Sequence, residues 1–381
     1  MPESSEPPKL YPDLELAADI HRALCGAGDV EKVKAALVEN NAFKMWDSVA
    51  EMGLKLGSKS NDLEKKAGEE IKALDEKLAA AKESGGETEI QEIQFSKANV
   101  LAKHGDFEGS NAIYAEIKAE KKVSSGKKIE AGFGEARNML FANEGIGKLM
   151  EEVAEYCKLG GDWDKRNRHA AYLALHNLRD REIEKAADSM KAGVKTFNAE
   201  EVISFKEFCK LCTVASIVTS SRSSLKKDII DCPEVKAQLG NDAEGEIVLQ
   251  VAKDLYDGAY DGYMRGIVQL TNVMEKDIYL KTHSNYIVRE LVVRGYEQFL
   301  RSYQSVTLAN MSDAFGVSRE HIDSTLSRFI SANRLDVKID KVNGVVERTE
   351  KGTRGKGYEG IVKEGDKVLN KMARLSRVVD V

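Results

Sequence analysis

The sequence predicts a mostly α-helical protein that combines a helical-repeat array, a winged-helix module and a final helix. Only 5 prolines occur in the 381 residues, and four of them precede residue 13, so long helices are unobstructed. The turn residues Asp106, Asn143 and Asp180 recur at intervals of 37 residues. Residues 296–348 follow the order helix, strand, helix, turn, helix, strand, turn, strand, which is typical of a winged helix-turn-helix.

The N-terminal part, residues 12–86, is predicted to hold short helices and one long charged helix. Residues 1–11 are polar and proline-rich and are expected to form a disordered tail. A first helix opens at Pro12-Asp13, and two short helices follow around Asn40-Asn41. The charged helix covers residues 61–84 and carries an apolar seam at heptad-like spacing, made of Leu63, Ala67, Ile71, Leu74, Leu78 and Ala81. Such a seam packs on a neighbouring helix, in this chain or in another.

Residues 87–285 are predicted to form a right-handed solenoid of tetratricopeptide-like helix pairs. A period in the mid-thirties is typical of this class. Because one pair cannot bury its apolar face alone, neighbouring pairs stack. Gly160 to Asp164 is expected to begin a helix in which Trp163 is a packing anchor. For the basic run 165–169, a solvated helix face is favoured over a binding patch.

The end of this region is predicted to hold three longer helices and one helix that begins at a proline. The longer helices are expected at residues 201–221, 247–270 and 278–302. Gly258, Gly262 and Gly266 weaken the second of these and would permit close helix approach. Pro233 is suited to the first turn of a helix between residues 228 and 240.

The winged-helix module is predicted within residues 286–350. Gly316 ends one helix and Ser318 caps the next. Alternating apolar and polar residues predict a strand at 335–340, and Asn343-Gly344 predicts a hairpin turn into a partner strand at 345–348.

The charge of this module argues against binding to a duplex. Residues 302–350 contain six Lys or Arg and seven Asp or Glu. Phosphate contacts supply most of the affinity for DNA, so a groove-binding module needs a basic face. The net charge of −6 likewise indicates no bulk affinity for nucleic acid or an anionic membrane. Protein–protein contact is the favoured function of the module.

The C-terminal part, residues 351–381, is predicted to be a link followed by a helix. Residues 352–357 are glycine-rich, and the helix is expected from Tyr358 to Val381. Its apolar stripe is made of Ile361, Val368, Met372, Leu375 and Val379. A terminal helix with such a stripe folds back on its own chain or inserts into a bundle with other chains.

Motifs of catalysis or metal binding are not apparent. Cys209 and Cys212 form a C-x-x-C, but no second pair follows at zinc spacing and both lie in an apolar helix, so core packing is favoured. We therefore expect no enzyme activity and no cofactor. Five scattered cysteines, no signal peptide and no membrane-spanning stretch predict a cytoplasmic and nuclear protein.

Several short stretches resemble one known family. The chain is similar to the PCI-domain subunit of the proteasome regulatory particle lid that is called non-ATPase regulatory subunit 6 in animals and is numbered seven in fungi. The matching text is GGDWDKRNR (160–168), SYQSVTL (302–308), AFGVS (314–318), LSRFI (326–330), RL (334–335), KIDKVN (338–343) and LSRV (375–378).

The resemblance implies a non-catalytic lid scaffold that serves ATP-dependent degradation of ubiquitinated proteins. Its expected partners are other PCI-domain lid subunits, and a contact between the charged helix 61–84 and the ATPase ring stays open. The winged helix would pair by a strand edge. The residues expected to take part are Asp336, Lys338, Asp340, Lys341, Val345 and Glu347, together with the C-terminal stripe in a bundle. A paralogous signalosome subunit and a nucleic-acid-binding winged helix are the alternatives.

Overall fold

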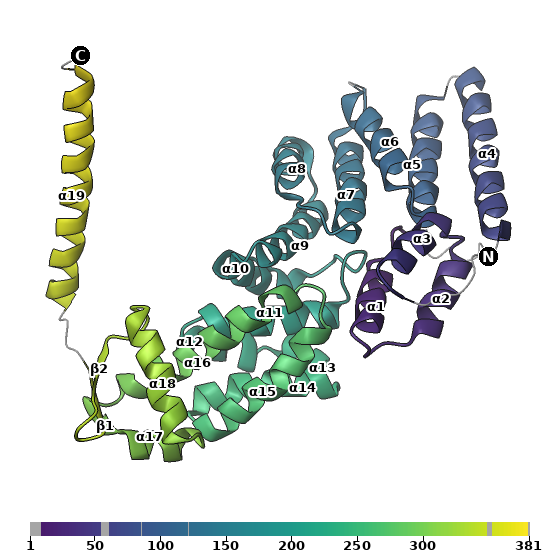
Figure 1. Ribbon diagram of the computed structural model, residues 1–381. Coiled ribbons are helices and arrows are strands. Elements are labelled where there is room, and N and C mark those ends of the chain that lie inside the picture. The colour runs from purple at the N-terminus through teal and green to yellow at the C-terminus, as the bar shows by residue number, and fades with distance from the viewer. Residues whose placement is uncertain (1–8, 55–60, 85, 121, 349–352, 380–381) are drawn as a thin grey trace. The chain divides into compact units, whose positions relative to one another are not determined.

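The computed structural model describes residues 9–54, 61–84, 86–120, 122–348 and 353–379 (Figure 1). The chain divides into two compact units. The first contains residues 1–257 and 265–289, and the second contains residues 258–264 and 290–381. Within the described residues the architecture is mostly helical, as predicted, with one three-stranded sheet in the second unit.

Three short helices open the first unit, and all three agree with the sequence prediction. They are α1 (Leu14–Leu24), α2 (Val30–Glu39) and α3 (Phe43–Glu51). Asp13 and Asp29 cap α1 and α2 through their side chains. The prediction of a disordered tail is wrong at residues 9–11, because Asn99 bonds to the backbone of Lys9 and Tyr11. The rest of that tail, residues 1–8, lies outside the described residues.

The charged helix α4 (Asn61–Ser84) packs on α5 (Glu87–His104) of the same chain. Its seam is buried at Leu63, Ala67 and Ala81. The prediction of a seam that finds a neighbour is therefore confirmed, and the neighbour is intramolecular.

Three helix hairpins follow, and their turns stand where the 37-residue spacing places them. The hairpins are α5 with α6 (Phe107–Ala119), α7 (Ser125–Phe141) with α8 (Gly147–Gly160), and α9 (Trp163–Arg179) with α10 (Ile183–Gly193). The turns use left-handed backbone at Gly105, Asn143 and Arg181. Trp163 is 66% exposed, so the prediction that it is a packing anchor is wrong. It stands at the first position of α9, where its side chain finds no core to enter.

The basic run after Trp163 makes contacts inside the helical array. Arg168 is 11% exposed and pairs with Glu130 of α7 at 2.8 Å and with Glu201 at 2.6 Å. Its guanidinium also lies over the ring of Phe133. Tyr172 donates its hydroxyl hydrogen to Glu201 at 2.8 Å. Arg168 is thus part of a shielded ion-pair network, which differs from the expected solvated face.

The helices that follow α10 depart from the predicted boundaries in three places. They begin with α11 (Phe205–Thr219), α12 (Arg222–Leu225), a π-helical turn (Lys226–Ile230), α13 (Pro233–Leu239) and α14 (Ala243–Asp257). The helix predicted from residue 201 begins at Phe205 because Ser204 caps it. Cys209 and Cys212 are fully buried in it, and Pro233 opens α13, as expected.

The helix predicted at 247–270 is instead two helices. Gly258 has a φ of +82° and separates α14 from α15 (Tyr260–Lys276). Gly266 permits the close approach that was expected, since a Cβ there would lie 2.6 Å from Val251. The helix predicted from residue 278 is wrong at its start. Asp277 accepts the N–H groups of Tyr279 and Leu280 and so holds a turn.

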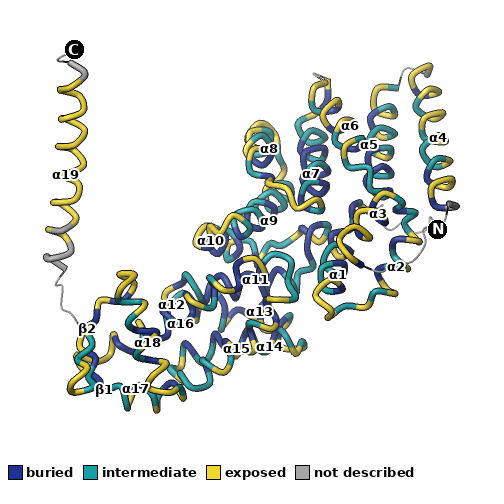
Figure 2. Tube along the Cα trace, viewed as in Figure 1, coloured by how far each residue is buried: buried dark blue, intermediate teal, exposed yellow. Residues whose placement is uncertain are grey.

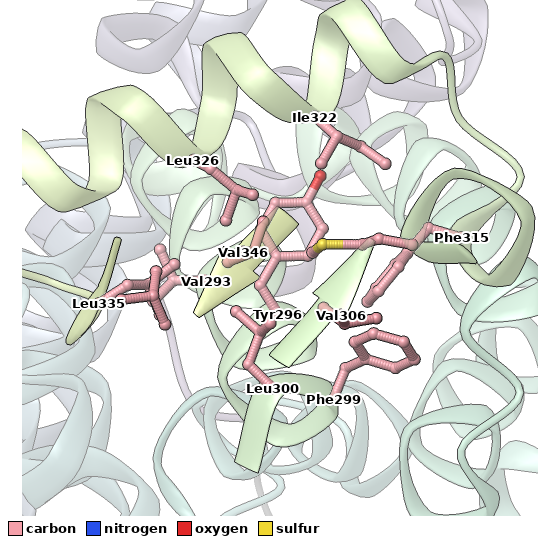
Figure 3. Packing of buried hydrophobic residues seen from close by; sticks show 12 residues of the cluster. Val293, Tyr296, Phe299, Leu300, Val306, Phe315, Ile322, Leu326, Leu335 and Val346 are labelled. Atoms are coloured by element: carbon pink, nitrogen blue, oxygen red, sulfur yellow. The ribbon is translucent and has the colours of Figure 1, made fainter. Parts of the chain in front are cut away.

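A 3₁₀ turn (Lys281–His283) leads to α16 (Ser284–Arg301), which supplies the first side of the winged-helix core. The module continues through β1 (Ser305–Thr307), α17 (Leu308–Phe315), α18 (Arg319–Ser331), β2 (Val337–Asp340) and β3 (Val345–Arg348). Its core holds Tyr296, Phe315, Leu326 and Val346 (Figure 3). Tyr296 and Phe315 meet edge to face at 4.9 Å.

The final helix is α19 (Thr353–Val379). It begins inside the stretch 352–357 that was predicted to be a link. A helical glycine costs only about 1 kcal/mol relative to alanine, so Gly355 and Gly357 do not by themselves exclude a helix.

Candidate protein-interaction surfaces

The sheet of the winged helix has the order β1-β3-β2, and both pairings are antiparallel. The middle strand β3 pairs through Val346 with Val306 on one side and with Ile339 on the other. The strand 345–348, with Val345 and Glu347, was predicted as one candidate edge. That prediction is wrong, because both of its sides are occupied. The edges belong to β1 and β2.

The charged residues of the wing divide into two groups. Lys338 is exposed and lies opposite Glu347 in the ladder, and the exposed Asp336 precedes β2. Asp340 instead accepts hydrogen bonds from Asn343 and from the N–H of Val342, and these bonds lower the pKa of Asp340. Its carboxylate therefore shapes the hairpin turn.

Lys341 is likewise engaged within the module. Its Nζ lies 3.2 Å from the carboxylate of Asp323 on α18. Val342 at the tip of the hairpin is 94% exposed. Lys338 and the edge of β2 are thus the parts of the predicted wing surface that the structure presents most openly.

The outer face of α18 carries mixed charge. Its exposed residues are Arg319, Glu320, His321, Ser324, Arg328 and Ser331. A helix that reads a DNA groove needs cations to meet the phosphates. This mixed face does not form a basic row.

The apolar stripe of α19 is exposed along its described length (Figure 2). The exposed fractions are 69% for Ile361, 54% for Val368, 62% for Met372 and 67% for Leu375. The side chain of Val379 lies outside the described residues. A helical wheel places the polar Lys363, Asp366, Asn370, Arg374 and Arg377 on the opposite face.

Two further residues widen this stripe. Val362 is 62% exposed and Leu369 is 65% exposed. Each stands one position after a stripe residue, and the two are seven residues apart. Val362 and Leu369 were not predicted as part of the stripe, although their seven-residue spacing indicates it.

Other kinds of site find no support in the described part of the chain. No cluster of three or more His, Cys, Asp or Glu side chains among the described residues could hold a metal ion. Among the described helices, none combines the length and the apolar character that a membrane span requires.

A helical array that leads into a winged-helix module defines the class of PCI-domain proteins, and the PCI domain family matches residues 268–350. A second family, described as 26S proteasome subunit RPN7, matches residues 58–228. The chain belongs to the family of the 26S proteasome non-ATPase regulatory subunit 6, whose yeast members are named RPN7.

Two relatives show the extent of the similarity. The chain is 34% identical over 314 residues to 26S proteasome non-ATPase regulatory subunit 6 of Dictyostelium discoideum, covering 82% of this chain and 81% of the relative. It is 30% identical over 323 residues to 26S proteasome regulatory subunit RPN7 of Saccharomyces cerevisiae, covering 84% and 75%.

A more distant similarity concerns the alternative family. COP9 signalosome complex subunit 1 of Arabidopsis thaliana is 24% identical over 156 residues, covering 41% of this chain and 34% of the relative. The match is shorter and weaker than those to the proteasome subunits. The comparison therefore favours the proteasome family over the signalosome family.

Proposed function

We propose that this protein is a non-catalytic scaffold subunit of the lid of the 26S proteasome regulatory particle. It would serve lid assembly and, through it, ATP-dependent degradation of ubiquitinated proteins. The observation that carries the proposal is the exposed apolar face of α19 in a chain whose relatives are named non-ATPase regulatory subunits of the proteasome. The protein would act in the cytoplasm and the nucleus.

The exposed face of α19 supports insertion into a helical bundle. Six of its apolar side chains are more than half exposed: Ile361, Val362, Val368, Leu369, Met372 and Leu375. A contiguous apolar patch of this kind marks a contact site in a soluble protein. Amphipathic helices bury such faces by packing side by side with others. The partners would be the C-terminal helices of sibling lid subunits.

The edge of β2 supports a second contact, with the PCI domain of a neighbouring subunit. An edge strand offers backbone groups to an added strand. Lys338 on β2 would contribute specificity more than affinity, because an exposed charge mainly selects partners and steers association. Asp336 beside it would act in the same way.

Removing the helix tests the bundle role. Deletion of residues 359–381 is expected to leave a folded protein that fails to enter the lid, because the truncated chain lacks the apolar face. The measurement is affinity purification of tagged full-length and truncated protein from native lysate, followed by mass spectrometry. Normal incorporation of the truncated chain would refute the bundle role.

The same purification distinguishes the alternatives. Recovery of lid subunits together with ATPase subunits supports the proteasome lid. Recovery of a complex without ATPases would move the assignment to a signalosome. Nucleic acid alone would restore the DNA-binding interpretation. Cross-linking of the purified particle at the lysines of α4 would test the contact with the ATPase ring.

A further inference from the structure

The N-terminal segment, residues 9–54, is held by the rest of the first unit on two sides of different chemistry. One side is apolar. Trp46, Val49 and Leu37 are buried in a core cluster, against which Phe107 of α6 and Phe141 of α7 pack. This side is a continuous hydrophobic core, and it anchors the segment to the helices α4 to α7.

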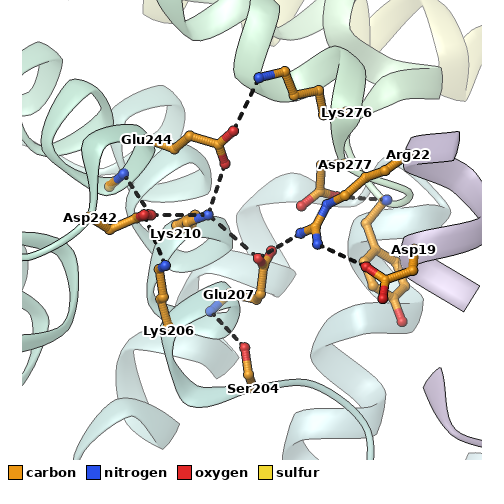
Figure 4. Close-up of polar contacts among 12 residues, drawn as sticks. Asp19, Arg22, Ser204, Lys206, Glu207, Lys210, Asp242, Glu244, Lys276 and Asp277 are labelled. Atoms are coloured by element: carbon orange, nitrogen blue, oxygen red, sulfur yellow. Dashed lines mark hydrogen bonds and ion pairs between the residues drawn. The ribbon is translucent and has the colours of Figure 1, made fainter. Parts of the chain in front are cut away.

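The other side of the segment is ionic (Figure 4). Arg22 of α1 reaches Glu207 of α11 at 2.9 Å, and the two side chains are 34% and 24% exposed. A few residues further on, Lys281 Nζ lies 3.1 Å from Cys25 Sγ. These contacts tie α1 to α11 and to the turn that follows α15.

A pocket of about 190 Å³ lies at this ionic side. Its walls come from both sides and include apolar as well as charged residues. They are Leu14, Glu15, Ala18, Asp19, Arg22 and Lys32 from the N-terminal segment, and Val202, Ile203, Ser204, Glu207, Lys276, Asp277, Ile278 and Tyr279 from the other side. Space of this size beside charged groups holds several water molecules. The ionic side therefore has room for water and is packed less closely than the apolar core on the other side.

Both members of the bridging ion pair have a second partner on their own side. Arg22 also lies 3.5 Å from Asp19 within α1. Glu207 lies 3.4 Å from Lys210, which is 7% exposed and also contacts Asp242 and Glu244. If the two sides separated, neither Arg22 nor Glu207 would be left without a counter-charge. The contact can thus break and re-form without isolating a charge.

We propose that the N-terminal segment is a latch, anchored by its apolar core to α4–α7 and closed reversibly on α11 and residues 275–281 through Arg22 and Glu207. On opening, the segment keeps its apolar core, to which Leu16, Ile20 and Ala23 of α1 belong, and only the contact with α11 and residues 275–281 is lost. Opening uncovers Val202 and Ile203, which are 3% and 7% exposed in the closed form. The latch is a property of the first unit and does not depend on the proposed function.

Hydrogen–deuterium exchange of the full chain tests the latch, with Arg22→Ala as the variant and Lys32→Ala as its matched control. Lys32 pairs with Asp19 at 2.7 Å, so its removal also takes an ion pair from Asp19 but breaks no bridge to α11. Arg22→Ala is expected to speed exchange in peptides covering 203–210 and 276–283 by about two- to five-fold, the effect of losing one partly exposed ion pair. Peptides of α3 and α5 are expected to keep the wild-type rate, and Lys32→Ala is expected to resemble wild type throughout.

Two results would overturn the proposal. Equal exchange in Arg22→Ala and Lys32→Ala would mean that the bridge does not close the segment. Faster exchange in α3 and α5 as well would mean that the segment unfolds and does not swing.

A second measurement uses the neighbouring side chains of Lys281 and Cys25 for cross-linking. A short amine-to-thiol cross-linker is expected to join Lys281 to Cys25 in the wild type, with a lower yield in Arg22→Ala and a recovered yield in Arg22→Lys. Once cross-linked, Arg22→Ala should regain wild-type protection at 203–210. Identical yields in all three proteins would contradict a latch that Arg22 closes.

Discussion

Helices α4 and α19 share one sequence pattern and have opposite surroundings. Both are long, rich in charge and marked by apolar residues at heptad-like spacing. In α4, Leu63 is 5% exposed and Ala67 is 0% exposed, because helices of the same chain cover this face. Helix α5 packs along α4, and Leu63 belongs to the core cluster that holds Trp46 and Val49 of α3. In α19, Ile361 is 69% exposed and Leu375 is 67% exposed. The pattern predicts an apolar face that packs on something, but among the described residues only the face of α4 is covered by the chain itself.

The largest difference between α4 and α19 is expected when a carboxylate is placed on the apolar face of each helix. Ala67→Glu places a carboxylate at a position that is fully buried in the first unit. It is expected to destabilise that unit by about 3–5 kcal/mol, since a buried charge without a partner is costly. Leu375→Glu on α19 is expected to change stability by less than about 0.5 kcal/mol, because its site is open to water. Thermal and denaturant unfolding of both variants provides the measurement. Similar losses in the two variants would contradict the assigned burial.

Removing an ion pair is expected to give a smaller difference in stability between a shielded site and the exposed surface of α19. Arg168→Met leaves Glu130 and Glu201 without their shared cation and is expected to cost about 2–4 kcal/mol, because the network is shielded. Lys367→Met removes the pair with Glu364 on α19, where both side chains are about 70% exposed, and is expected to cost less than about 0.5 kcal/mol. Arg168→Lys is the control variant. It keeps the positive charge but lacks the planar guanidinium that bonds to Glu130 and Glu201 at the same time. Equal midpoints for Arg168→Met and wild type would refute the structural role of the network.

The smallest expected effect is a pH dependence at the ionic side of the N-terminal segment. Burial raises the pKa of Asp277 to about 6, and Glu207 adds to the rise. The charged groups around this pocket are Glu15, Asp19, Arg22 and Lys32 from α1 and α2, Glu207 and Lys210 from α11, and Lys276 beside it.

The sign follows from the raised pKa. Between the ordinary carboxyl pKa and about pH 6, Asp277 is protonated in the folded state and ionised in the unfolded state. The contribution of this group to the free energy of unfolding therefore rises as the pH falls through 6. Asp277→Asn keeps the acceptor for Tyr279 and Leu280 and is expected to remove about 1 kcal/mol of this dependence between pH 7.5 and 5. The readout is the difference between wild-type and variant unfolding midpoints at the two pH values. A difference that does not change with pH would contradict the raised pKa of Asp277.

The sequence was informative where the signal is local. Asp13, Ser318 and Pro233 mark helix starts because capping and proline geometry act within one turn. The three hairpin turns at 37-residue spacing could be predicted for the same reason. The split at Gly258 was missed, since a glycine inside an apolar periodicity does not by itself reveal a left-handed residue.

Features that depend on distant pairing were harder to read. The central position of β3 requires β1, which lies some forty residues earlier in the chain, so the hairpin alone suggested two free edges. Arg168 looked like part of a solvated basic face because Glu130 and Glu201 stand more than thirty residues away on either side. The exposure of the α19 stripe was left open by its pattern, as the contrast with α4 explains.

Paired charge substitutions on the two faces of α19 test whether its apolar face is an assembly surface. Met372→Glu places a carboxylate on that face, whereas Asn370→Glu places the same group on the opposite, polar face. Each tagged variant would be purified from cells and its partners quantified by mass spectrometry. We expect Asn370→Glu to recover proteasome regulatory subunits as the wild type does, and Met372→Glu to lose at least about 90% of them, since a buried carboxylate is strongly unfavourable at a helix interface. Equal recovery by the two variants would contradict an assembly role of the apolar face.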